Sequence, residues 1–320
     1  MSKPTLWVTR HLTDPVMERA HRDYHVLQTP DDHVMSFSEL IAASQEADAM
    51  LICHSEHFTG PMISRLSDRL KIVANHSVGV DHCDLNALRN RGISVTNTPD
   101  VLSDATAEIA MLLMLGAARR AYEGDNMVRS GIWKDWAPKM MNGFQITGKK
   151  LGIIGMGRVG QVVAERARGF GMEVHYHNRN KIPDTVITSA IYHERLESLL
   201  STVDVVSLNC PATEENHNLI NKETLYQMKT GSILVNTARG ALVDEDALIE
   251  SLNSGQLRAA GLDCFKHEPG GNPKLSELQQ VFMLPHIGSA TDDTRAAMGF
   301  RALDNLDQFF AGNTPQDLLN

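Results

Sequence analysis

Three side chains that can bind an anion or move a proton are associated with three separate apolar runs in the second half of the chain. Arg239 ends the run SILVNTAR, Glu268 follows the run AAGLDCF, and His286 lies in the run VFMLPHIG. Each run has the length and composition of a buried strand. In an open parallel sheet, ligands bind outside the carboxyl ends of the strands. We therefore expect these three side chains to meet at one site.

This combination of groups suits the reduction of a carbonyl that has a carboxylate as its neighbour. A protonated His286 can give its proton to the carbonyl oxygen, where negative charge develops. A carboxylate beside the ring, here Glu268, favours the charged imidazolium. Arg239 can hold the substrate carboxylate through two parallel hydrogen bonds. Together the three residues indicate chemistry on a 2-oxo acid.

A glycine-rich loop follows another apolar run, KLGIIGMG. Gly155, Gly157 and Gly160 match the pattern G-x-G-x-x-G, and a helix and a second strand follow within the ~30 residues of a βαβ unit. The first glycine permits a tight turn, the second lets a pyrophosphate approach the backbone, and the third lets the helix pack close to the strand. The helix N-terminus adds free N–H groups and the positive end of its dipole. The pattern predicts a dinucleotide site, with a purely structural turn as the alternative.

The residue that ends the next strand bears on the choice of dinucleotide. NAD-specific sites place Asp or Glu there, where the carboxylate accepts a hydrogen bond from the ribose 2′-OH. This chain has Asn178, followed by Arg179 and then Lys181. One charge-assisted bond to a 2′-phosphate is worth ~1.5–3 kcal/mol, about a ten- to hundredfold preference. We predict that NADP(H) is preferred and that NAD(H) is possible. The alternative is that Arg179 and Lys181 are solvated loop charges.

Apolar runs alternate with amphipathic stretches along the whole chain, which predicts parallel sheets covered by helices on both faces. The predicted strands cover residues 5–10, 48–55, 70–77 and 93–99 in a first set, and 150–157, 173–178, 204–211, 232–239, 259–265 and 281–288 in a second. One long helix is predicted between the sets, over residues 103–131. Its middle is apolar nearly all round, so it should be buried or lie in a subunit interface. Residues 291–312 are again helical and could pack back on the first set.

Composition narrows the class of protein. The 320 residues suggest two domains, and 42% hydrophobic with 22% charged residues is ordinary for a globular protein. A net charge of −9 argues against nucleic-acid binding. The four cysteines form no CxxC pair, so no metal site is expected. The most apolar run, residues 109–118, is shorter than the ~20 residues of a membrane span. We expect no membrane association and a cytoplasmic location.

The chain resembles the D-2-hydroxyacid dehydrogenases, and within them the glyoxylate/hydroxypyruvate reductases. The matching segments are SVGVDHCDL, TPDVLSDATAEIAMLLML, GIIGMGRVGQVVAERARGFGM, LNCPATEENHNLIN, ILVNTARGALVDEDALIE, AAGLDCF and LPHIGSAT. The resemblance implies an α/β fold with two doubly wound parallel-sheet domains. In that fold a Rossmann cofactor domain, residues 100–288, is inserted into a flavodoxin-like substrate-binding domain made of residues 1–99 and 289–320.

The resemblance also implies roles for particular positions. His286 would be the proton donor, Glu268 its carboxylate partner, and Arg239 the ligand of the substrate carboxylate and carbonyl. The implied substrate-binding residues are Ser55, Val78 and Gly79 (the last two through their backbone), Arg239 and His286. The implied cofactor-binding residues are Thr106, Gly155, Gly157, Arg158, Val159, Gly160, Asn178, Arg179, Lys181, Cys210, Thr237, Ala238, Asp263 and Gly288. Of these, Asp263 would bind the nicotinamide amide.

The implied activity is NADPH-dependent reduction of glyoxylate and hydroxypyruvate to glycolate and D-glycerate, in a homodimer formed through the cofactor domains. Related reductases place an aromatic residue of the partner subunit near the substrate, where this chain has Met140 and Met141. Methionine makes a more adaptable wall. One alternative is therefore an enzyme for bulkier 2-oxo or D-2-hydroxy acids that uses NAD(H). The alternative from another class is a dinucleotide-sensing regulatory binding protein, because fold alone does not settle function.

Overall fold

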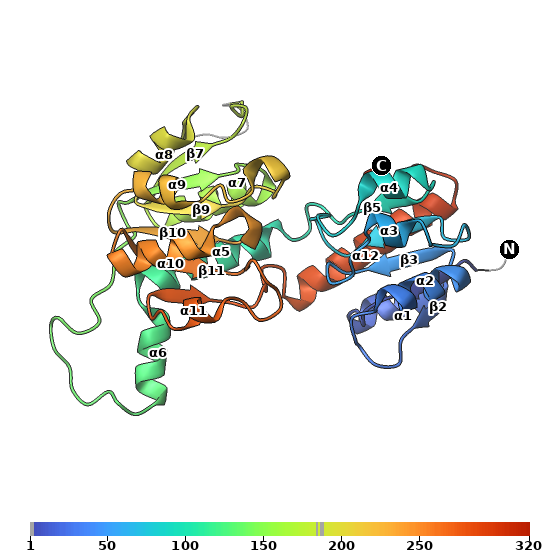
Figure 1. Ribbon diagram of the computed structural model, residues 1–320, viewed down its shortest axis with the longest axis horizontal. Coiled ribbons are helices and arrows are strands. Elements are labelled where there is room, and N and C mark those ends of the chain that lie inside the picture. Colours follow the sequence, from blue (N-terminus) through green and yellow to red (C-terminus); the bar gives the residue numbers. More distant parts are fainter. Residues whose placement is uncertain (1–2, 184, 186–188) are drawn as a thin grey trace. The chain divides into compact units, whose positions relative to one another are not determined.

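The computed structural model describes residues 3–183, 185 and 189–320. The chain divides into two compact units (Figure 1). The first consists of Met1–Leu102 together with Ala290–Asn320, and the second of Ser103–Ser289. The first unit is thus assembled from two separate parts of the chain.

The first unit is built around a five-stranded sheet in which all neighbouring strands are parallel. Its strands are β1 (Thr5–Val8), β2 (His25–Gln28), β3 (Ala49–Ile52), β4 (Ile72–Asn75) and β5 (Ser94–Thr96). The spatial order β2-β1-β3-β4-β5 is the 2-1-3-4-5 order of flavodoxin-like domains. Strands β3 and β4 are buried along their whole length, as expected for parallel strands that are covered on both faces.

Helices flank this sheet, and the last of them comes from the end of the chain. They are α1 (Asp14–Asp23), α2 (Phe37–Glu46), α3 (Gly60–Ile63), α4 (Leu85–Asn90) and α12 (Asp292–Phe310). Helix α12 packs against β4 and α1, so the C-terminal helix does return to the first set of strands. Strand β2 lies outside the predicted strands. Its four residues are only partly buried, and it lies at the sheet edge, so its apolar pattern is weak.

The second unit contains a seven-stranded parallel sheet. Its strands are β6 (Lys150–Ile154), β7 (Glu173–His177), β8 (Ala190–Tyr192), β9 (Val205–Leu208), β10 (Ser232–Asn236), β11 (Leu257–Leu262) and β12 (Val281–Met283). The order β12-β11-β10-β9-β6-β7-β8 reverses direction between β6 and β9. This reversal is the topological switch point of a Rossmann-type sheet. The predicted class, two doubly wound parallel-sheet domains, is therefore confirmed. Only the short edge strand β8 lies outside the prediction.

Helices cover the second sheet and link its strands. Helix α5 (Ser103–Ala118) packs against α7 (Arg158–Gly169) and against β10, β11 and β12. The remaining helical elements are α6 (Ala121–Arg129), α8 (Leu196–Thr202), α9 (Lys222–Gln227), α10 (Glu245–Ser254), α11 (Pro273–Ser276) and the 3-10 turns Glu214–Asn216 and Gly240–Leu242.

The single long helix predicted over residues 103–131 is wrong: it is two helices, α5 and α6. Arg120 separates them with φ +57°, a left-handed conformation that an α-helix interior does not accommodate. The backbone N–H of Phe144 donates to the carbonyl oxygen of Ala118 at 2.7 Å, so a later segment uses a carbonyl from the last turn of α5. The apolar part of the predicted helix, α5, is buried as expected. Helix α6 has no buried residue.

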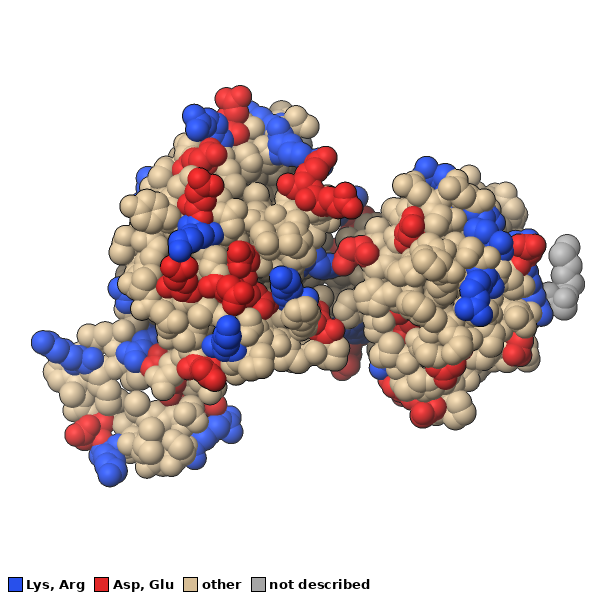
Figure 2. Space-filling model, in the orientation of Figure 1, with Lys and Arg blue, Asp and Glu red and all other residues tan. Residues whose placement is uncertain are grey.

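The surface of the described chain carries mixed charge. On the face shown in Figure 2, acidic and basic side chains are interspersed on each unit, without the basic stripe typical of nucleic-acid-binding faces. None of the helices in the described part of the chain combines the length and the apolar character that a membrane-spanning helix needs.

Candidate active site

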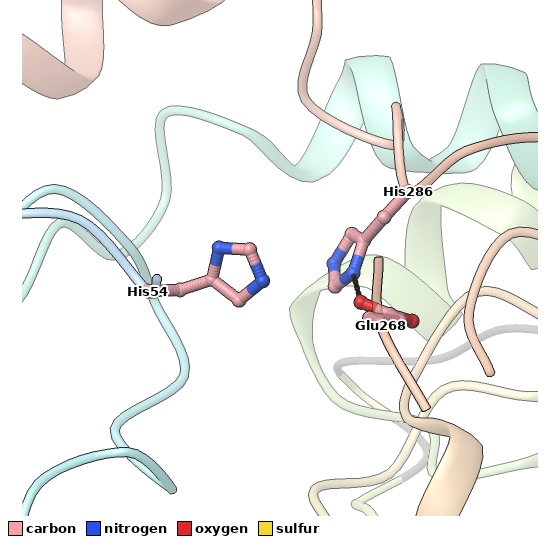
Figure 3. A group of neighbouring side chains, drawn as sticks. All are labelled: His54, Glu268 and His286. Atoms are coloured by element: carbon pink, nitrogen blue, oxygen red, sulfur yellow. Dashed lines mark hydrogen bonds and ion pairs between the residues drawn. The ribbon is translucent and has the colours of Figure 1, made fainter. Parts of the chain in front are cut away.

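His286 and Glu268 form a direct pair at the carboxyl ends of β12 and β11. The ring Nδ1 of His286 lies 2.6 Å from Oε2 of Glu268 (Figure 3). The other carboxylate oxygen, Oε1, accepts the backbone N–H of Phe265 at 2.7 Å. One oxygen therefore holds the loop while the other orients the imidazole. Because Nδ1 faces the carboxylate, Nε2 is the ring nitrogen suited to exchange a proton with a substrate.

The backbone at His286 is held in an unusual conformation. Its φ is +53°, and a non-glycine residue held in this region costs roughly 1–3 kcal/mol. The next two backbone N–H groups, of Ile287 and Gly288, donate to Oδ1 and Oδ2 of Asp263 at 2.8 and 2.7 Å. Asp263 is 1% exposed, and this burial raises the pKa of its carboxyl group. The structure thus makes Asp263 the residue that holds the histidine loop, and its implied contact with nicotinamide stays a prediction.

Arg239 follows β10 and is positioned by its own loop. Asn236 donates from Nδ2 to the carbonyl oxygen of Arg239 at 2.8 Å, and its Oδ1 accepts the N–H of Ala238 at 3.0 Å. At Gly240, a Cβ atom would lie 1.9 Å from the carbonyl carbon of Phe265. Only glycine permits this approach, which brings the Arg239 loop against the segment that leads to the catalytic carboxylate.

Two buried polar residues outside the predicted site brace these loops. Glu245, 7% exposed, accepts the N–H of Lys266 at 2.7 Å and the side-chain amide of Asn272 at 2.9 Å. It therefore holds the segment that carries Glu268. Asn236 has the corresponding role for Arg239. A polar residue at the end of the otherwise apolar run SILVN is a signal for Asn236, whereas Glu245 lies in an acidic helix start that resembles a simple helix cap.

The glycine loop fits a dinucleotide, and its three glycines have different reasons. A Cβ on Gly155, whose φ is +96°, would lie 2.5 Å from the backbone nitrogen of Cys210, and one on Gly160 would lie 2.2 Å from the carbonyl oxygen of Gly155. The protein's own packing therefore requires both. At Gly157, no atom of the described residues lies within 4 Å of the Cβ position. This open space at the start of α7 is where a pyrophosphate would approach the helix N-terminus.

Asn178 links the end of β7 to this loop. Its Oδ1 accepts the backbone N–H of Met156 at 2.7 Å, and its carbonyl oxygen accepts a hydrogen bond from the hydroxyl of Tyr192 at 3.3 Å. Because Oδ1 faces Met156, the amide Nδ2 with its two hydrogens is directed elsewhere. Arg179 and Lys181 follow on an exposed loop.

The other predicted cofactor residues lie at the carboxyl edge of the sheet or on adjacent helix ends. Thr106 on α5 is 8% exposed, and a Cβ on Gly288 would lie 3.5 Å from its hydroxyl oxygen. Burial raises the pKa of Cys210 to about 11, so this thiol stays neutral and can only line a site. Thr237 donates to the side-chain oxygen of Asn209 at 3.5 Å. Ala238 is buried, Val159 is half-buried and Arg158 is exposed.

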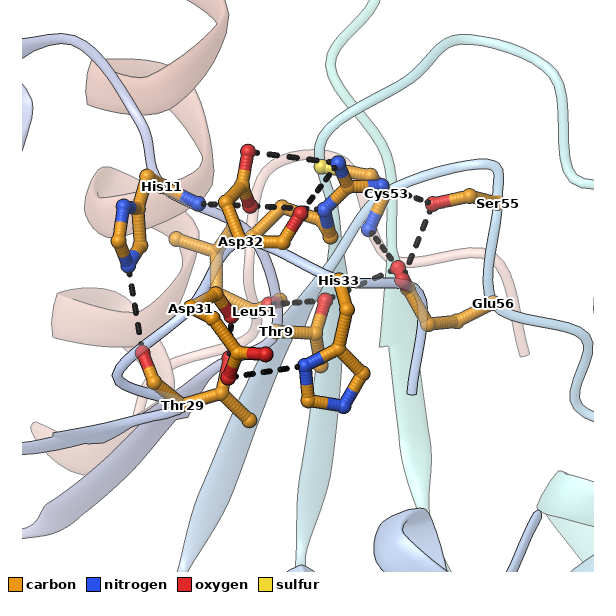
Figure 4. Close-up of polar contacts among 11 residues, drawn as sticks. Thr9, His11, Thr29, Asp31, Asp32, His33, Leu51, Cys53, Ser55 and Glu56 are labelled. Atoms are coloured by element: carbon orange, nitrogen blue, oxygen red, sulfur yellow. Dashed lines mark hydrogen bonds and ion pairs between the residues drawn. The ribbon is translucent and has the colours of Figure 1, made fainter. Parts of the chain in front are cut away.

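In the first unit, Ser55 follows β3 within a polar network (Figure 4). Its hydroxyl donates to Oε1 of Glu56 at 3.0 Å and accepts a bond from Arg10 at 3.4 Å. Glu56 is fully buried, and its Oε2 accepts the hydroxyl of Thr9 at 2.9 Å and the N–H of Cys53 at 3.0 Å. Glu56 therefore fixes the conformation of this loop, a role that the sequence pattern does not reveal.

Among the described residues, the only group of three or more potential metal ligands includes Glu268 and His286, which are already accounted for as a hydrogen-bonded pair. The pairing with a carboxylate at 2.6 Å suits a proton donor as well as a ligand, and the expectation of no metal stays a prediction.

Comparisons with known proteins agree with this geometry. Residues 111–288 match the family model described as D-isomer specific 2-hydroxyacid dehydrogenase, NAD binding domain. The chain is 40% identical to a glycerate dehydrogenase of Hyphomicrobium methylovorum, over 98% of each protein. It is 38% identical to a glyoxylate reductase of Thermococcus litoralis, over 99% of this chain and 97% of that protein. Its structure matches the NADPH-dependent glyoxylate/hydroxypyruvate reductase of Sinorhizobium meliloti, solved with NADP and malonate, with a TM-score of 0.88 and 28% identity over 99% of this chain and 97% of the other.

Proposed function

The chain belongs to the D-isomer specific 2-hydroxyacid dehydrogenase family, and on that premise we propose that it reduces glyoxylate and hydroxypyruvate to glycolate and D-glycerate with NADPH. The observation that supports the reaction best is the 2.6 Å pair of His286 and Glu268 beside a dinucleotide-type glycine loop. The substrates are taken from the activities named for the relatives, a glycerate dehydrogenase and a glyoxylate reductase.

The residues of the chain have separate tasks in this reaction. When bound and reduced, the nicotinamide cofactor supplies a hydride to the carbonyl carbon. Arg239 holds the substrate carboxylate by a bidentate pair and so orients the carbonyl. As negative charge develops on the carbonyl oxygen, His286 gives it the proton from Nε2. Glu268 stabilises the imidazolium before transfer and keeps the ring in place. The neutral imidazole then regains a proton from solvent.

In the first unit we propose that the backbone N–H groups of Val78 and Gly79 bind the substrate carboxylate and that Ser55 lines the substrate pocket. For the cofactor, we propose contacts from the glycine loop, Arg158 and Val159 to the pyrophosphate, and from Thr106 to a phosphate. Further proposed contacts to the nucleotide and the nicotinamide come from Cys210, Thr237, Ala238, Asp263 and Gly288.

The preference for NADPH rests on the end of β7. No carboxylate stands there to repel a 2′-phosphate, because Asn178 occupies the position and turns its oxygen toward Met156. Arg179 and Lys181 follow on exposed backbone, within the same short loop. The Sinorhizobium meliloti relative is named as NADPH-dependent and was solved with NADP, which supports the same choice for this chain.

We further propose a homodimer through the second unit. Large apolar side chains are exposed on α6 and the segment after it: Tyr122 48%, Val128 62%, Ile132 60%, Trp133 53% and Trp136 75%. Figure 1 shows this segment extending away from the sheet of its own unit. Monomers rarely expose contiguous apolar patches of this kind, and tryptophan is enriched where interfaces derive their binding energy. A second copy of the chain is the occupant we propose for this surface.

The direct test is kcat/KM for glyoxylate and hydroxypyruvate, measured with NADPH and with NADH side by side. A lead of tenfold or more for NADPH is the expected result. Equal use, or a lead for NADH, would overturn the cofactor preference and leave the reaction class intact. Turnover only with bulkier 2-oxo acids would favour the alternative substrate range, for which the half-buried Met140 and Met141 are the motivating residues. NADPH binding without turnover of any 2-oxo acid would favour a dinucleotide-sensing protein.

A further inference from the structure

The loop after β4 has three consecutive carbonyl groups fixed by two asparagine side chains. Asn75, the last residue of β4, donates from Nδ2 to the carbonyl oxygens of Ser77 at 3.3 Å and of Gly79 at 2.9 Å. Asn97, which directly follows β5, donates from Nδ2 to the carbonyl oxygen of Val78 at 2.9 Å. All of these residues belong to the first unit. The carbonyls of residues 77–79 are therefore all turned toward side-chain amides of the unit itself.

A buried histidine sets the orientation of the first of these amides. Nε2 of His82 lies 3.1 Å from Oδ1 of Asn75, and the two side chains are 5% and 0% exposed. An amide oxygen can only accept, so Nε2 of His82 carries the hydrogen and donates it. Nδ2 of Asn75 must then face the loop carbonyls. The backbone N–H of Thr98 adds a second bond to the carbonyl oxygen of Ser77, at 3.1 Å.

Fixing the carbonyls also fixes the N–H groups. In a trans peptide the C=O of one residue and the N–H of the next point in opposite directions within one plane. The bonds to Ser77 O and Val78 O therefore turn the N–H groups of Val78 and Gly79 away from the two asparagines. Within the described chain, neither of these N–H groups donates to a protein acceptor, and both residues are half-buried. Consecutive N–H groups of this kind form a concavity that binds anions.

We infer that Asn75 and Asn97 are positioning residues that aim the N–H groups of Val78 and Gly79 at the substrate carboxylate, with His82 holding Asn75. The inference rests on the proposed function, because it deepens the role of the loop in that reaction. Neither asparagine touches the substrate. Each acts through a carbonyl group of the loop, and the pair explains how an irregular segment presents its donors in a defined direction.

The same network contains a matched control. Asn305 on α12 is 1% exposed and donates from Nδ2 to the carbonyl oxygen of Asn97 at 3.2 Å and to Asp317 at 2.9 Å. It is as buried as Asn75 and makes as many bonds, yet it contacts no carbonyl of the loop. A change at Asn305 should therefore reduce stability without changing the direction of the loop N–H groups.

The experiment compares Asn97→Ala, Asn75→Ala and Asn305→Ala with the wild type, all as full chains. Asn97 is only partly buried, so Asn97→Ala is the variant expected to fold even where Asn75→Ala does not. Oxalate is the probe for carboxylate binding, measured by calorimetry on the NADPH-loaded protein. Glyoxylate turnover gives KM and kcat, cofactor fluorescence gives NADPH affinity, and thermal unfolding gives stability.

We expect the loop variants to bind oxalate about ten- to a hundredfold more weakly, as for the loss of a charge-assisted hydrogen bond. The KM for glyoxylate should rise by a similar factor with a much smaller change in kcat, because the carboxylate is held in ground and transition states alike. NADPH affinity should not change. Asn305→Ala should lower the melting temperature while oxalate affinity stays at the wild-type value.

Oxalate affinity at the wild-type value in a folded Asn97→Ala protein would overturn the inference, as would an equal loss of affinity in Asn305→Ala. The two proposals can fail separately. A wild-type protein that binds oxalate through this loop but does not reduce glyoxylate would contradict the proposed function and leave the positioning role standing. A wild-type protein that neither binds oxalate nor turns over glyoxylate would overturn both.

Discussion

The side-chain oxygen of Asn178 accepts the backbone N–H of Met156 at 2.7 Å, which ties the end of β7 to the glycine loop. An aspartate at position 178 could accept the same bond, but its second oxygen would carry charge toward the ribose. Asn178→Asp should therefore lower the NADPH-to-NADH ratio of kcat/KM by about tenfold or more. The measurement is steady-state kinetics with both cofactors. An unchanged ratio would mean that this position does not face the 2′-phosphate.

Removal of the proposed acid should affect turnover and spare cofactor binding. His286→Ala should lower kcat by about 10²–10⁴-fold, the usual contribution of general acid–base catalysis. NADPH affinity, followed by fluorescence, should stay near the wild-type value. His267 is an exposed histidine on the neighbouring loop, so His267→Ala is a matched control that should keep full activity. Near-normal turnover in His286→Ala would show that another group is the acid.

The carboxylate partner should set the pH range of the reaction. Glu268→Gln keeps an oxygen for the N–H of Phe265 but removes the negative charge beside His286. The imidazolium is then less stabilised, so the proton donor is lost at a lower pH. The pH at which 2-oxo acid reduction falls to half its maximum should therefore decrease in the variant. A pH–rate profile of kcat/KM measures this, and an unchanged midpoint would separate Glu268 from proton transfer.

Acid should destabilise the protein through His76 at the end of β4. Burial lowers the pKa of His76 from 6.5 to about 4, and its Nε2 donates to the carbonyl oxygen of Arg295 on α12 at 3.1 Å. A group with a depressed pKa in the folded state contributes stability above its unfolded pKa and loses it as the pH falls through the folded pKa. The loss should occur between pH 6.5 and about 4.

His76→Gln tests this expectation, because glutamine can donate to the same carbonyl and does not titrate. Chemical unfolding at several pH values should show that the free energy of unfolding falls less steeply below pH 6.5 in the variant than in the wild type. At neutral pH the variant should be no more stable than the wild type. Parallel curves for the two proteins would show that His76 is not a source of the acid sensitivity.

The exposed segment after α6 should control assembly. Trp136 is 75% exposed, and truncation of a tryptophan at the centre of an interface costs roughly 2 kcal/mol or more, about a thirtyfold weaker dimer. Trp136→Ala should shift the dimer–monomer equilibrium toward monomer, as measured by light scattering over a dilution series. Tyr226 on α9, 83% exposed, offers Tyr226→Ala as a control that should not change assembly. A monomeric wild-type protein would contradict the proposed dimer.

Several short elements could not be predicted from the sequence for a shared physical reason. The edge strands β2 and β8 are short and only partly buried, so they carry little of the apolar pattern that marks the central strands. The break between α5 and α6 lies at Arg120, a residue that is a good helix former. There the tertiary packing of the following segment overrides the local preference.

The braces of the site were also hidden from sequence reasoning. Asn75, Glu56 and Glu245 are polar residues whose bonds go to loop backbone and to side chains, several of them far along the chain. In the sequence each resembles a cap, a turn or a surface residue. Their partners are known only once the strand order brings separate loops to the same edge of a sheet.

By itself, the sequence determined the two parallel-sheet domains, the glycine loop and the residues that end strands β10, β11 and β12. These follow from local physics, because burial on both faces demands continuous apolar runs and a tight turn demands glycine. Only the tertiary structure decided that Glu268 faces Nδ1 of His286, that Asp263 holds the histidine loop and that Asn75 turns the loop after β4. Hydrogen bonds act over about 3 Å, so a partner is set by the distance in space that folding creates and not by separation along the chain.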